Sequence, residues 1–469
     1  MVRSAAAIAV LSAPVDTFAH GIGERYDLPV PLPLWLTGAA IAVLASFVVA
    51  AVAVRRTPAS EQLGPPTYHA SRRLERLRQI AQLCGVAVLI LVVVAAFYGD
   101  QTPTRNIAPI MVWVVWWIGL AYVSALCVNV WPAVNPWSAV FAGLETALRT
   151  LGFSPVPRSY PAWLGSWPAV LLFGAFAWIE LVYDARAIPR QLGILILGYS
   201  LITWTGMLLY GRDVWLAKGD PFTVAFRTLG MFAPLQIDCR WKLRLRPYGS
   251  GLVASDAVSP SMLVFVSLLL STVTFDGFLA TPAWNAVERF LFSELTIFDS
   301  YSRLTAINSM GLMLFALGFL SLYLLTARWM AARSRGELST ASAARLFVVT
   351  LIPIAVGYHL AHYLSYFLQQ GQLVFRLISD PLGLGWDLFG TARYRPNYDV
   401  VGARFIWYVS VAAIVTGHIF AVYCAHRIAL RKIPDLQKVL ASQLPMLVLM
   451  IAYTVISLWI IAQPVTTSG

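Results

Sequence analysis

The chain has 469 residues, of which 59% are hydrophobic and 12% are charged, and its formal net charge is +12. A soluble protein carries about twice that charged fraction, so the composition excludes an ordinary soluble domain. Apolar runs of about 20 residues recur along the chain, and they do not alternate as β-barrel strands do. We therefore predict an all-α fold, a polytopic transmembrane helical bundle whose partner is the lipid bilayer. Basic loops at a membrane face explain the charge without a nucleic acid.

The N-terminal stretch "MVRSAAAIAVLSAPVDTFAHGIG" has the pattern of a secretory signal peptide. It combines a basic Arg3, a short apolar run and the small residues Thr17 and Ala19 before a cleavage point. We predict that residues 1–19 are a signal peptide and that residues 20–469 form a single integral membrane helical domain. Cleavage would leave His20 at the new N-terminus, where an amine and an imidazole together chelate copper. The alternative is a short uncleaved helix.

Ten spans follow from the apolar runs, because each run is long enough to cross the bilayer. Their approximate ranges are 32–54, 80–98, 108–130, 164–183, 191–211, 260–278, 305–328, 346–369, 403–426 and 438–462. The loops at one face are rich in arginine and lysine, and the loops at the other face are mixed in sign. Basic loops mark the cytoplasm, so we predict a multi-pass protein of the bacterial cytoplasmic (inner) membrane with both mature termini on the periplasmic side.

Two segments between the spans carry their own periodicity. Residues 135–152, "NPWSAVFAGLETALRTLG", have apolar residues at helical spacing and predict a short interfacial helix. Residues 237–246, "IDCRWKLRLR", alternate as a strand does, and the turn "PYGSG" follows them. We predict a small cytoplasmic β-ribbon there. The four cysteines show no paired spacing, so a disulfide framework or a zinc finger is not expected.

Histidines stand inside the predicted spans, where water is scarce. The run "GYHLAHYLSY" places His359 and His362 one helical turn apart, and the next span holds His418. Ionisable groups are costly in a span, and imidazoles from neighbouring helices suit zinc or copper. We predict a divalent metal site, zinc or copper, with His359, His362, His418 and Asp276 as ligands. The alternatives are interhelical hydrogen bonds without chemistry, and a haem held by two histidines.

Carboxylates near the predicted span ends supply candidate catalytic groups. They are Asp276 in "TFDGF", Glu180 in "WIELVYD" and Asp387 in "ISDPLGLGWDLFG". A carboxylate beside a metal-bound water would act as general base. The loop around Asp387 is either a lid over a membrane cavity or a capping structure held by Asx turns. The remaining intramembrane histidine, His426, lies beside Arg427 and is expected at the cytoplasmic interface.

Several long motifs resemble one bacterial family. They are "AHGIGERYDLPVPLPLW", "NIAPIMVWVVWWIGLAYVSAL", "NPWSAVF", "FAWIELVY", "TFDGFLATPAWN", "LAHYLSYFLQQGQ" and "ISDPLGLGWDLFGTA". Together they are similar to segments of bacterial multi-pass membrane proteins of the fenitrothion hydrolase-like family. The resemblance implies hydrolysis of an organophosphate phosphotriester with release of a nitrophenol. It supplies no catalytic residues, so the site prediction rests on residue chemistry.

The first functional prediction is therefore an integral membrane hydrolase, metal-dependent, that acts on apolar phosphotriesters of the fenitrothion type. Such substrates would reach the site through the bilayer. A copper-handling or redox membrane protein is the second prediction, and it depends on His20. A proton-coupled small-solute transporter or a subunit of a homo- or hetero-oligomer is the third. The sequence shows neither an internal repeat nor an obvious broken-helix pair, which disfavours the transporter.

Overall fold

The computed structural model describes residues 30–55, 67–68, 72–153, 156–237, 242–296 and 299–463. The predicted signal peptide and His20 lie outside these residues. Within the described part, ten helical segments are long and apolar enough to cross a membrane, which confirms the all-α, polytopic prediction. They are Leu32–Ala53, Arg76–Tyr98, Ile107–Leu126, Ala162–Leu181, Pro189–Tyr210, Pro260–Leu279, Ser300–Arg333, Thr340–Leu377, Ala403–Lys432 and Leu436–Ile461.

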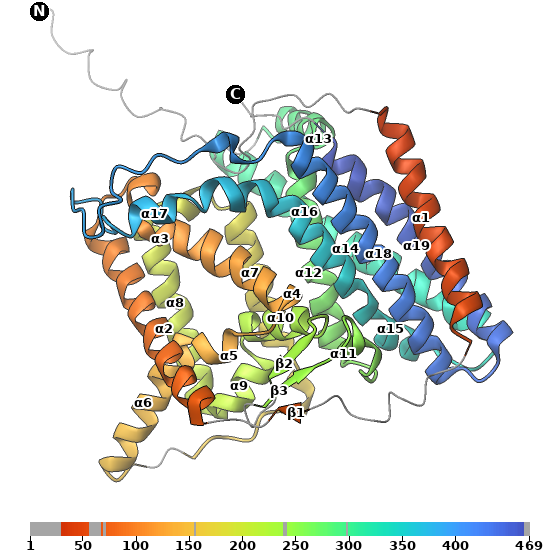
Figure 1. Cartoon of the computed structure of the whole chain (residues 1–469), viewed down its shortest axis with the longest axis horizontal. Helices are drawn as coiled ribbons and strands as arrows, with labels where there is room; N and C mark the ends of the chain where they lie inside the picture. The colour runs from red at the N-terminus through yellow and green to blue at the C-terminus, as the bar shows by residue number, and fades with distance from the viewer. Residues whose placement is uncertain are drawn as a thin grey trace, which may run out of the picture.

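The helical elements of these spans and of their connections are arranged as Figure 1 shows. The first half of the chain contains α1 (Leu32–Ala53), α2 (Arg72–Tyr98), η2 (Pro103–Arg105), α3 (Ile107–Pro109), η3 (Ile110–Gly119), α4 (Leu120–Leu126), α5 (Trp131–Val134), α6 (Pro136–Thr150), η4 (Ala162–Leu164), α7 (Trp167–Leu181), η5 (Asp184–Ala187), α8 (Pro189–Tyr210), α9 (Arg212–Lys218) and α10 (Pro221–Gly230). The second half contains α11 (Ser250–Val253), α12 (Pro260–Leu279), α13 (Pro282–Glu294), α14 (Ser300–Arg333), α15 (Thr340–Phe347), η6 (Val348–Leu351), α16 (Ile352–Gln370), α17 (Leu373–Leu377), η7 (Tyr398–Val400), α18 (Ala403–Lys432) and α19 (Leu436–Ile461).

Most predicted span ends agree with the structure to within a few residues, but three spans are longer than their apolar runs. The clearest case is α14, which begins five residues before the predicted range and ends five residues after it. The Asp299 carboxylate caps its start by accepting a hydrogen bond from the Ser302 N–H at 3.1 Å. Arg333 lies in its last turn, where a cation complements the helix dipole. Polar caps extend these helices beyond the stretch that hydropathy detects.

Two spans contain irregular helix. The third span passes from α3 through a π-helix, η3, into α4. The eighth span passes from α15 through a 3₁₀ turn, η6, into α16. These two spans pack against each other, α16 on η3 and on α4. Such irregular stretches are common at functional sites.

The eighth span is the centre of the bundle. In its most apolar window 78% of the residues are buried inside the protein, against 17% for the second span. Its helix α16 packs against α18, and the two come together at Gly357 and Gly417. The side chains of α16 therefore face other helices rather than lipid, which places its histidines inside the protein.

The first span, α1, packs mainly on the last two, α18 and α19 (Figure 1, right). His426 of α18 joins the three helices, because its Nε2 lies 2.8 Å from the Val54 carbonyl at the end of α1 and its Nδ1 lies within 3.3 Å of the Gln443 amide of α19. The His426 side chain is fully buried. His426 thus lies near the ends of both α1 and α18 and is buried between helices, and its place at the cytoplasmic interface stays a prediction.

A small sheet lies at the end of the bundle opposite α13 and α17 (Figure 1), and we call this end the sheet face. Its strands are β1 (Thr67–Tyr68), β2 (Leu235–Ile237) and β3 (Leu243–Leu245), in the antiparallel order β1-β3-β2. Leu235 pairs with Leu245, so β2 and β3 form a hairpin. The predicted ribbon is confirmed in its second half, while residues 238–241 lie outside the described residues. The predicted helix over residues 135–152 is α6.

Candidate active site

The helix α16 places three polar side chains in the centre of the bundle: His359, His362 and Tyr363. Residues three apart point about 300° around a helix, so the two imidazoles diverge by about 60°. Tyr363 lies between them, and its ring centroid is 4.7 Å from that of His359 and 4.7 Å from that of His362. One tyrosine therefore separates two imidazoles that have different neighbours.

His362 is paired with Asp276 of α12. Its Nε2 lies 2.9 Å from Asp276 Oδ2, and the two side chains are only 6% and 14% exposed. The Tyr363 hydroxyl donates to the same carboxylate oxygen at 2.6 Å and lies 3.3 Å from Glu180 Oε1 of α7. A tyrosine hydroxyl has one proton, so a full hydrogen bond to the second carboxylate needs a proton from Glu180 itself. Three helices thus bring two carboxylates, an imidazole and a phenol into one proton-sharing cluster.

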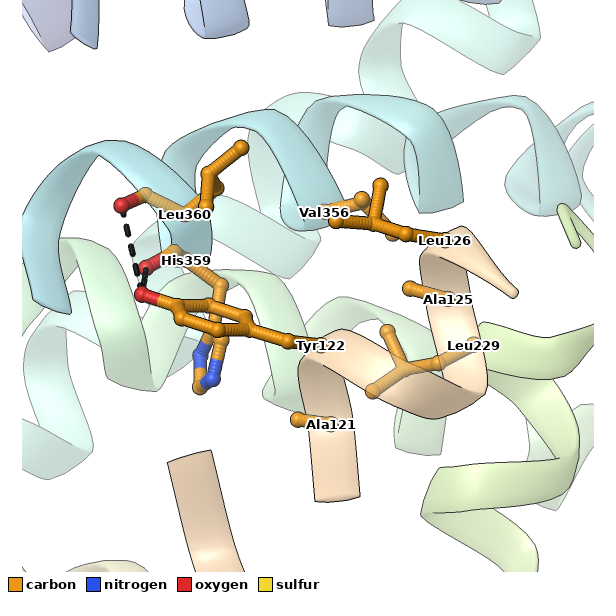
Figure 2. Close-up of a pocket in the computed structure, with 8 residues that line it drawn as sticks. All are labelled: Ala121, Tyr122, Ala125, Leu126, Leu229, Val356, His359 and Leu360. Carbon is orange, nitrogen blue, oxygen red and sulfur yellow. Dashed lines mark hydrogen bonds between the residues drawn. The ribbon is translucent and has the colours of Figure 1, made fainter. Parts of the chain in front are cut away.

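His359 has aromatic neighbours. Its ring centroid lies 5.9 Å from that of Trp117 on η3 and 5.6 Å from that of Tyr122 on α4. Its Nε2 is buried without a hydrogen-bond partner. Figure 2 shows its imidazole beside Tyr122 at a cavity of about 10 Å³, which is otherwise lined by apolar side chains. A cavity of that size holds about one water molecule and is too small for an organic ligand.

His418 has its own partner on α18. Its Nδ1 donates to the Ile414 carbonyl at 2.8 Å, and its ring centroid lies 5.8 Å from that of Tyr453 on α19. In the described part of the chain, no three His, Cys, Asp or Glu residues are grouped so that they could hold a metal ion. Of the four predicted ligands, His362 and Asp276 are in direct contact. The metal itself stays a prediction.

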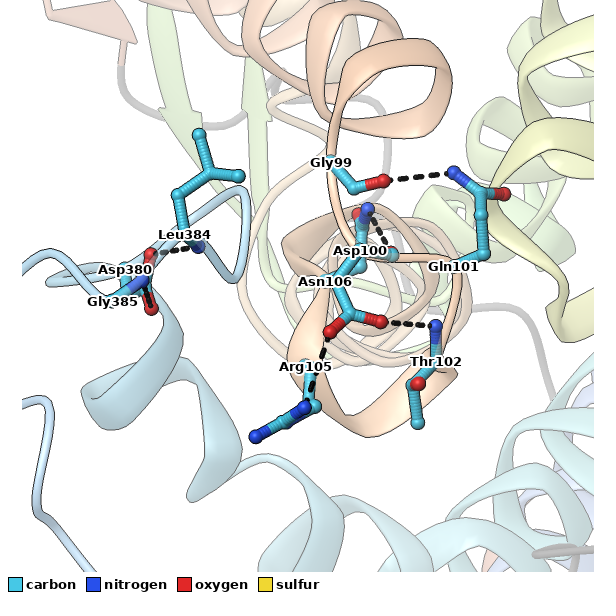
Figure 3. Close-up of polar contacts among 9 residues, drawn as sticks. All are labelled: Gly99, Asp100, Gln101, Thr102, Arg105, Asn106, Asp380, Leu384 and Gly385. Atoms are coloured by element: carbon cyan, nitrogen blue, oxygen red, sulfur yellow. Dashed lines mark hydrogen bonds and ion pairs between the residues drawn. The ribbon is translucent and has the colours of Figure 1, made fainter.

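Asp387 lies in the exposed loop that follows α17, and its Oδ1 accepts a hydrogen bond from the Ala392 N–H at 3.0 Å. Asp380 in the same loop accepts from the N–H groups of Leu384 and Gly385, each at 2.9 Å (Figure 3). These bonds reach four and five residues along the chain, so they are wider than the predicted Asx turns, which reach two, and they hold the loop together as side-chain caps. The contacts give Asp387 a role in shaping the loop.

This loop is fastened to the connection between α2 and α3. The Asp100 N–H donates to Leu382 O at 2.7 Å, and the Ile107 N–H donates to Pro381 O at 3.0 Å. Within the connection, the Thr102 N–H donates to Asp100 Oδ1 at 2.8 Å, and this bond holds the pKa of Asp100 below its ordinary range (Figure 3). The two loops form one folded unit at the face opposite the sheet.

Sequence reasoning missed Tyr363 and Trp117. Tyr363 follows His362 directly, and a phenol beside an intramembrane imidazole is a signal that could have been used. Trp117 reaches His359 because the π-helix η3 changes which side chains of the third span face α16, and the run "WVVWW" carries no mark of that change.

Comparison of the chain with protein-family models, with curated proteins and with solved structures finds no match.

Proposed function

We propose that the chain is an integral membrane hydrolase of apolar esters, phosphotriesters of the organophosphate type among them, and that the Asp276–His362 pair is its general base. The supporting observation is the 2.9 Å contact between His362 Nε2 and Asp276 Oδ2, with Tyr363 linking that oxygen to Glu180. A carboxylate that holds an imidazole in one orientation and stabilises its cation is a recurrent device of hydrolases.

In the proposed reaction, a water molecule gives one proton to the Asp276–His362 pair while its oxygen attacks phosphorus or a carbonyl carbon. The bond to the leaving alkoxide or phenoxide breaks, and Glu180 supplies the proton that the leaving oxygen takes up. The proton on the base then returns to Glu180 through Tyr363, which restores the starting state. General acid–base catalysis of this kind contributes about 10²- to 10⁴-fold. The steps use only groups that the structure brings together.

The membrane setting suits such substrates. Asp276 stands near the end of α12 and Glu180 near the end of α7, at the face opposite the sheet. An apolar ester concentrates in the bilayer and would approach the cluster sideways between helices. We place the sheet face in the cytoplasm of a bacterial cell, because the arginine-rich loops lie there, and both termini outside.

The test is hydrolysis of a chromogenic aryl phosphotriester by the purified protein in lipid nanodiscs. We expect Asp276→Asn and His362→Gln each to lower the rate by about 100-fold or more, because each removes half of the base. The matched control is Asp213→Asn, since the Asp213 side chain is 90% exposed and the same substitution there leaves the cluster intact. Full activity in the Asp276→Asn protein would refute the proposal.

A second candidate, proton-coupled transport of a small solute, is favoured by the two irregular spans. The π-helix η3 of the third span packs on α16, and the 3₁₀ turn η6 leads directly into α16 from α15. Interrupted spans that meet near the membrane centre are a feature of secondary transporters. Solute-induced currents on a solid-supported membrane would distinguish the two functions, because a hydrolase moves no net charge across the bilayer.

A further inference from the structure

A second set of buried polar side chains lies deeper in the bundle, next to the Asp276–His362 pair. Thr274 of α12, two residues from Asp276, donates its hydroxyl proton to the Leu270 carbonyl at 2.8 Å. The Tyr453 hydroxyl of α19 also hydrogen-bonds the Thr274 oxygen. Because the only hydroxyl proton of Thr274 is already donated, Tyr453 is the donor in that bond. The Tyr453 oxygen is left with lone pairs that can accept.

His418 adds a second acceptor in the same place. Its Nδ1 carries the proton, because that atom lies 2.8 Å from the Ile414 carbonyl, so in the neutral ring Nε2 has a free lone pair. The side chain is 1% exposed, and Nε2 has no partner in the protein. Its ring is the one that lies 5.8 Å from Tyr453. Neither ring can satisfy the other, since both present acceptors.

Two further hydroxyls complete the set. A Cβ placed on Gly277 would lie 2.3 Å from the Tyr358 hydroxyl, so that hydroxyl lies against α12 directly beside Asp276. The Tyr358 ring also stacks on His362, with 6.1 Å between centroids. Ser457 stands one turn from Tyr453 on α19, and it is fully buried. The Tyr358 hydroxyl has no partner in the protein, and the Ser457 hydroxyl faces the Tyr453 oxygen without the geometry of a full hydrogen bond.

Buried polar atoms are hydrogen-bonded in at least about 90% of cases, and water supplies the bond where the protein does not. We propose that Tyr358, Tyr453, His418 and Ser457 bind a file of internal water that connects the Asp276–His362 pair with the middle of the membrane. Water donates to the free acceptors of His418 and Tyr453 and accepts from the hydroxyls of Tyr358 and Ser457. His418 is 14 residues from the end of α18, about 21 Å along the helix, so these waters are remote from the membrane surface.

The file gives the two reactants separate approaches. That this water attacks the substrate rests on the proposed hydrolysis, whereas the presence of the water in the bundle does not. The apolar ester arrives from the bilayer, while the file holds water beside the base on the inner side of the bundle, along Tyr358.

The experiment is water-edited solid-state NMR of the protein in lipid bilayers, with histidine labelled by ¹⁵N. The chain has six histidines, and the His418 signal is assigned by its loss in His418→Gln. We expect magnetisation from water to build up on His418 severalfold faster than on His426. His426 is equally buried but has both ring nitrogens bonded to protein, so it is the internal control. Build-up on His418 as slow as on His426 would overturn the proposal.

A pair of variants tests the connection to Asp276. The methyl group of Gly277→Ala would displace the Tyr358 hydroxyl, so we expect slower build-up on His418. Gly198→Ala is the control, because nothing lies within 4 Å of the added Cβ there. If Gly277→Ala leaves the build-up unchanged, the water does not pass Tyr358, and the route is wrong. The measurement needs no substrate, so a failure of the hydrolase proposal would be seen separately.

Discussion

The contact between α16 and α18 in the centre of the bundle gives a prediction about stability. A Cβ added to Gly357 of α16 would lie 2.5 Å from the Ala413 carbonyl oxygen of α18, and a Cβ added to Gly417 would lie 2.5 Å from the Pro353 carbonyl oxygen of α16. Both carbonyl oxygens belong to the backbone, so they cannot move away by a change of side-chain rotamer. Gly357→Ala therefore has to push the two helices apart.

The size of the effect follows from the distance. Ordinary contact begins at 3.4 Å, so the helices must separate by about 0.9 Å or tilt by an equivalent amount. Overpacking of this kind costs about 1–3 kcal/mol, and the loss of contacts along the α16–α18 interface places Gly357→Ala at the upper end. His359 and His362 are on the same helix within five residues. A shift of that size would also change the 2.9 Å contact between His362 and Asp276 of α12.

The free energy of unfolding would be measured by titration with sodium dodecyl sulfate in mixed micelles. Gly198→Ala is again the matched control, since its Cβ meets nothing and Ala favours a helix over Gly by about 0.5–1 kcal/mol. We expect Gly357→Ala to be less stable than the parent by about 2–3 kcal/mol and Gly198→Ala to be at least as stable. Equal stability of the two variants would show that α16 and α18 do not cross at these glycines.

Two further predictions concern charge and metal. Asp220 is fully buried, and burial raises the pKa of its carboxyl above the ordinary value. The stability that this carboxyl contributes is fully present below its ordinary pKa and is lost as pH rises through the raised value. Asp220→Asn does not titrate, so its free energy of unfolding should increase relative to that of the parent as pH rises. A difference between the two that stays constant with pH would contradict this reasoning. For the metal, mass spectrometry should find about one zinc or copper per chain, lost in the His359→Ala, His362→Ala double variant, if the predicted centre forms. Protein that holds neither ion would contradict the predicted centre.

Hydropathy predicted the spans well because burial in lipid demands long apolar runs with their backbone bonded internally. It predicted α12 and the start of α18 to within one residue, at 260–279 and at Ala403. It could not detect η3 or η6, since π and 3₁₀ geometry depends on how the neighbouring helices pack and not on the composition of the span. The β1 strand could not be predicted either, because its partner strand β3 is about 175 residues away in the sequence.

The candidate site was predicted in part. Asp276 and His362 are 86 residues apart in sequence, and they were expected together only as ligands of one metal ion. His418 was expected beside them, yet its Nδ1 bonds within its own helix to Ile414. A helix can supply such a local acceptor at any position, so sequence spacing cannot decide between a partner on another helix and one on the same helix.

The position of α1 bears on how the protein is made. Synthesis runs from the N-terminus, yet the helices that cover α1 are the last two, and His426 closes the end of α1 only after about 370 residues have followed Val54. The ribosome therefore delivers the first span long before its neighbours exist. Until then α1 is surrounded by lipid or by the insertion machinery, and a chain that stops short of α18 leaves it there. The final step of assembly is the one that joins the beginning of the chain to its end.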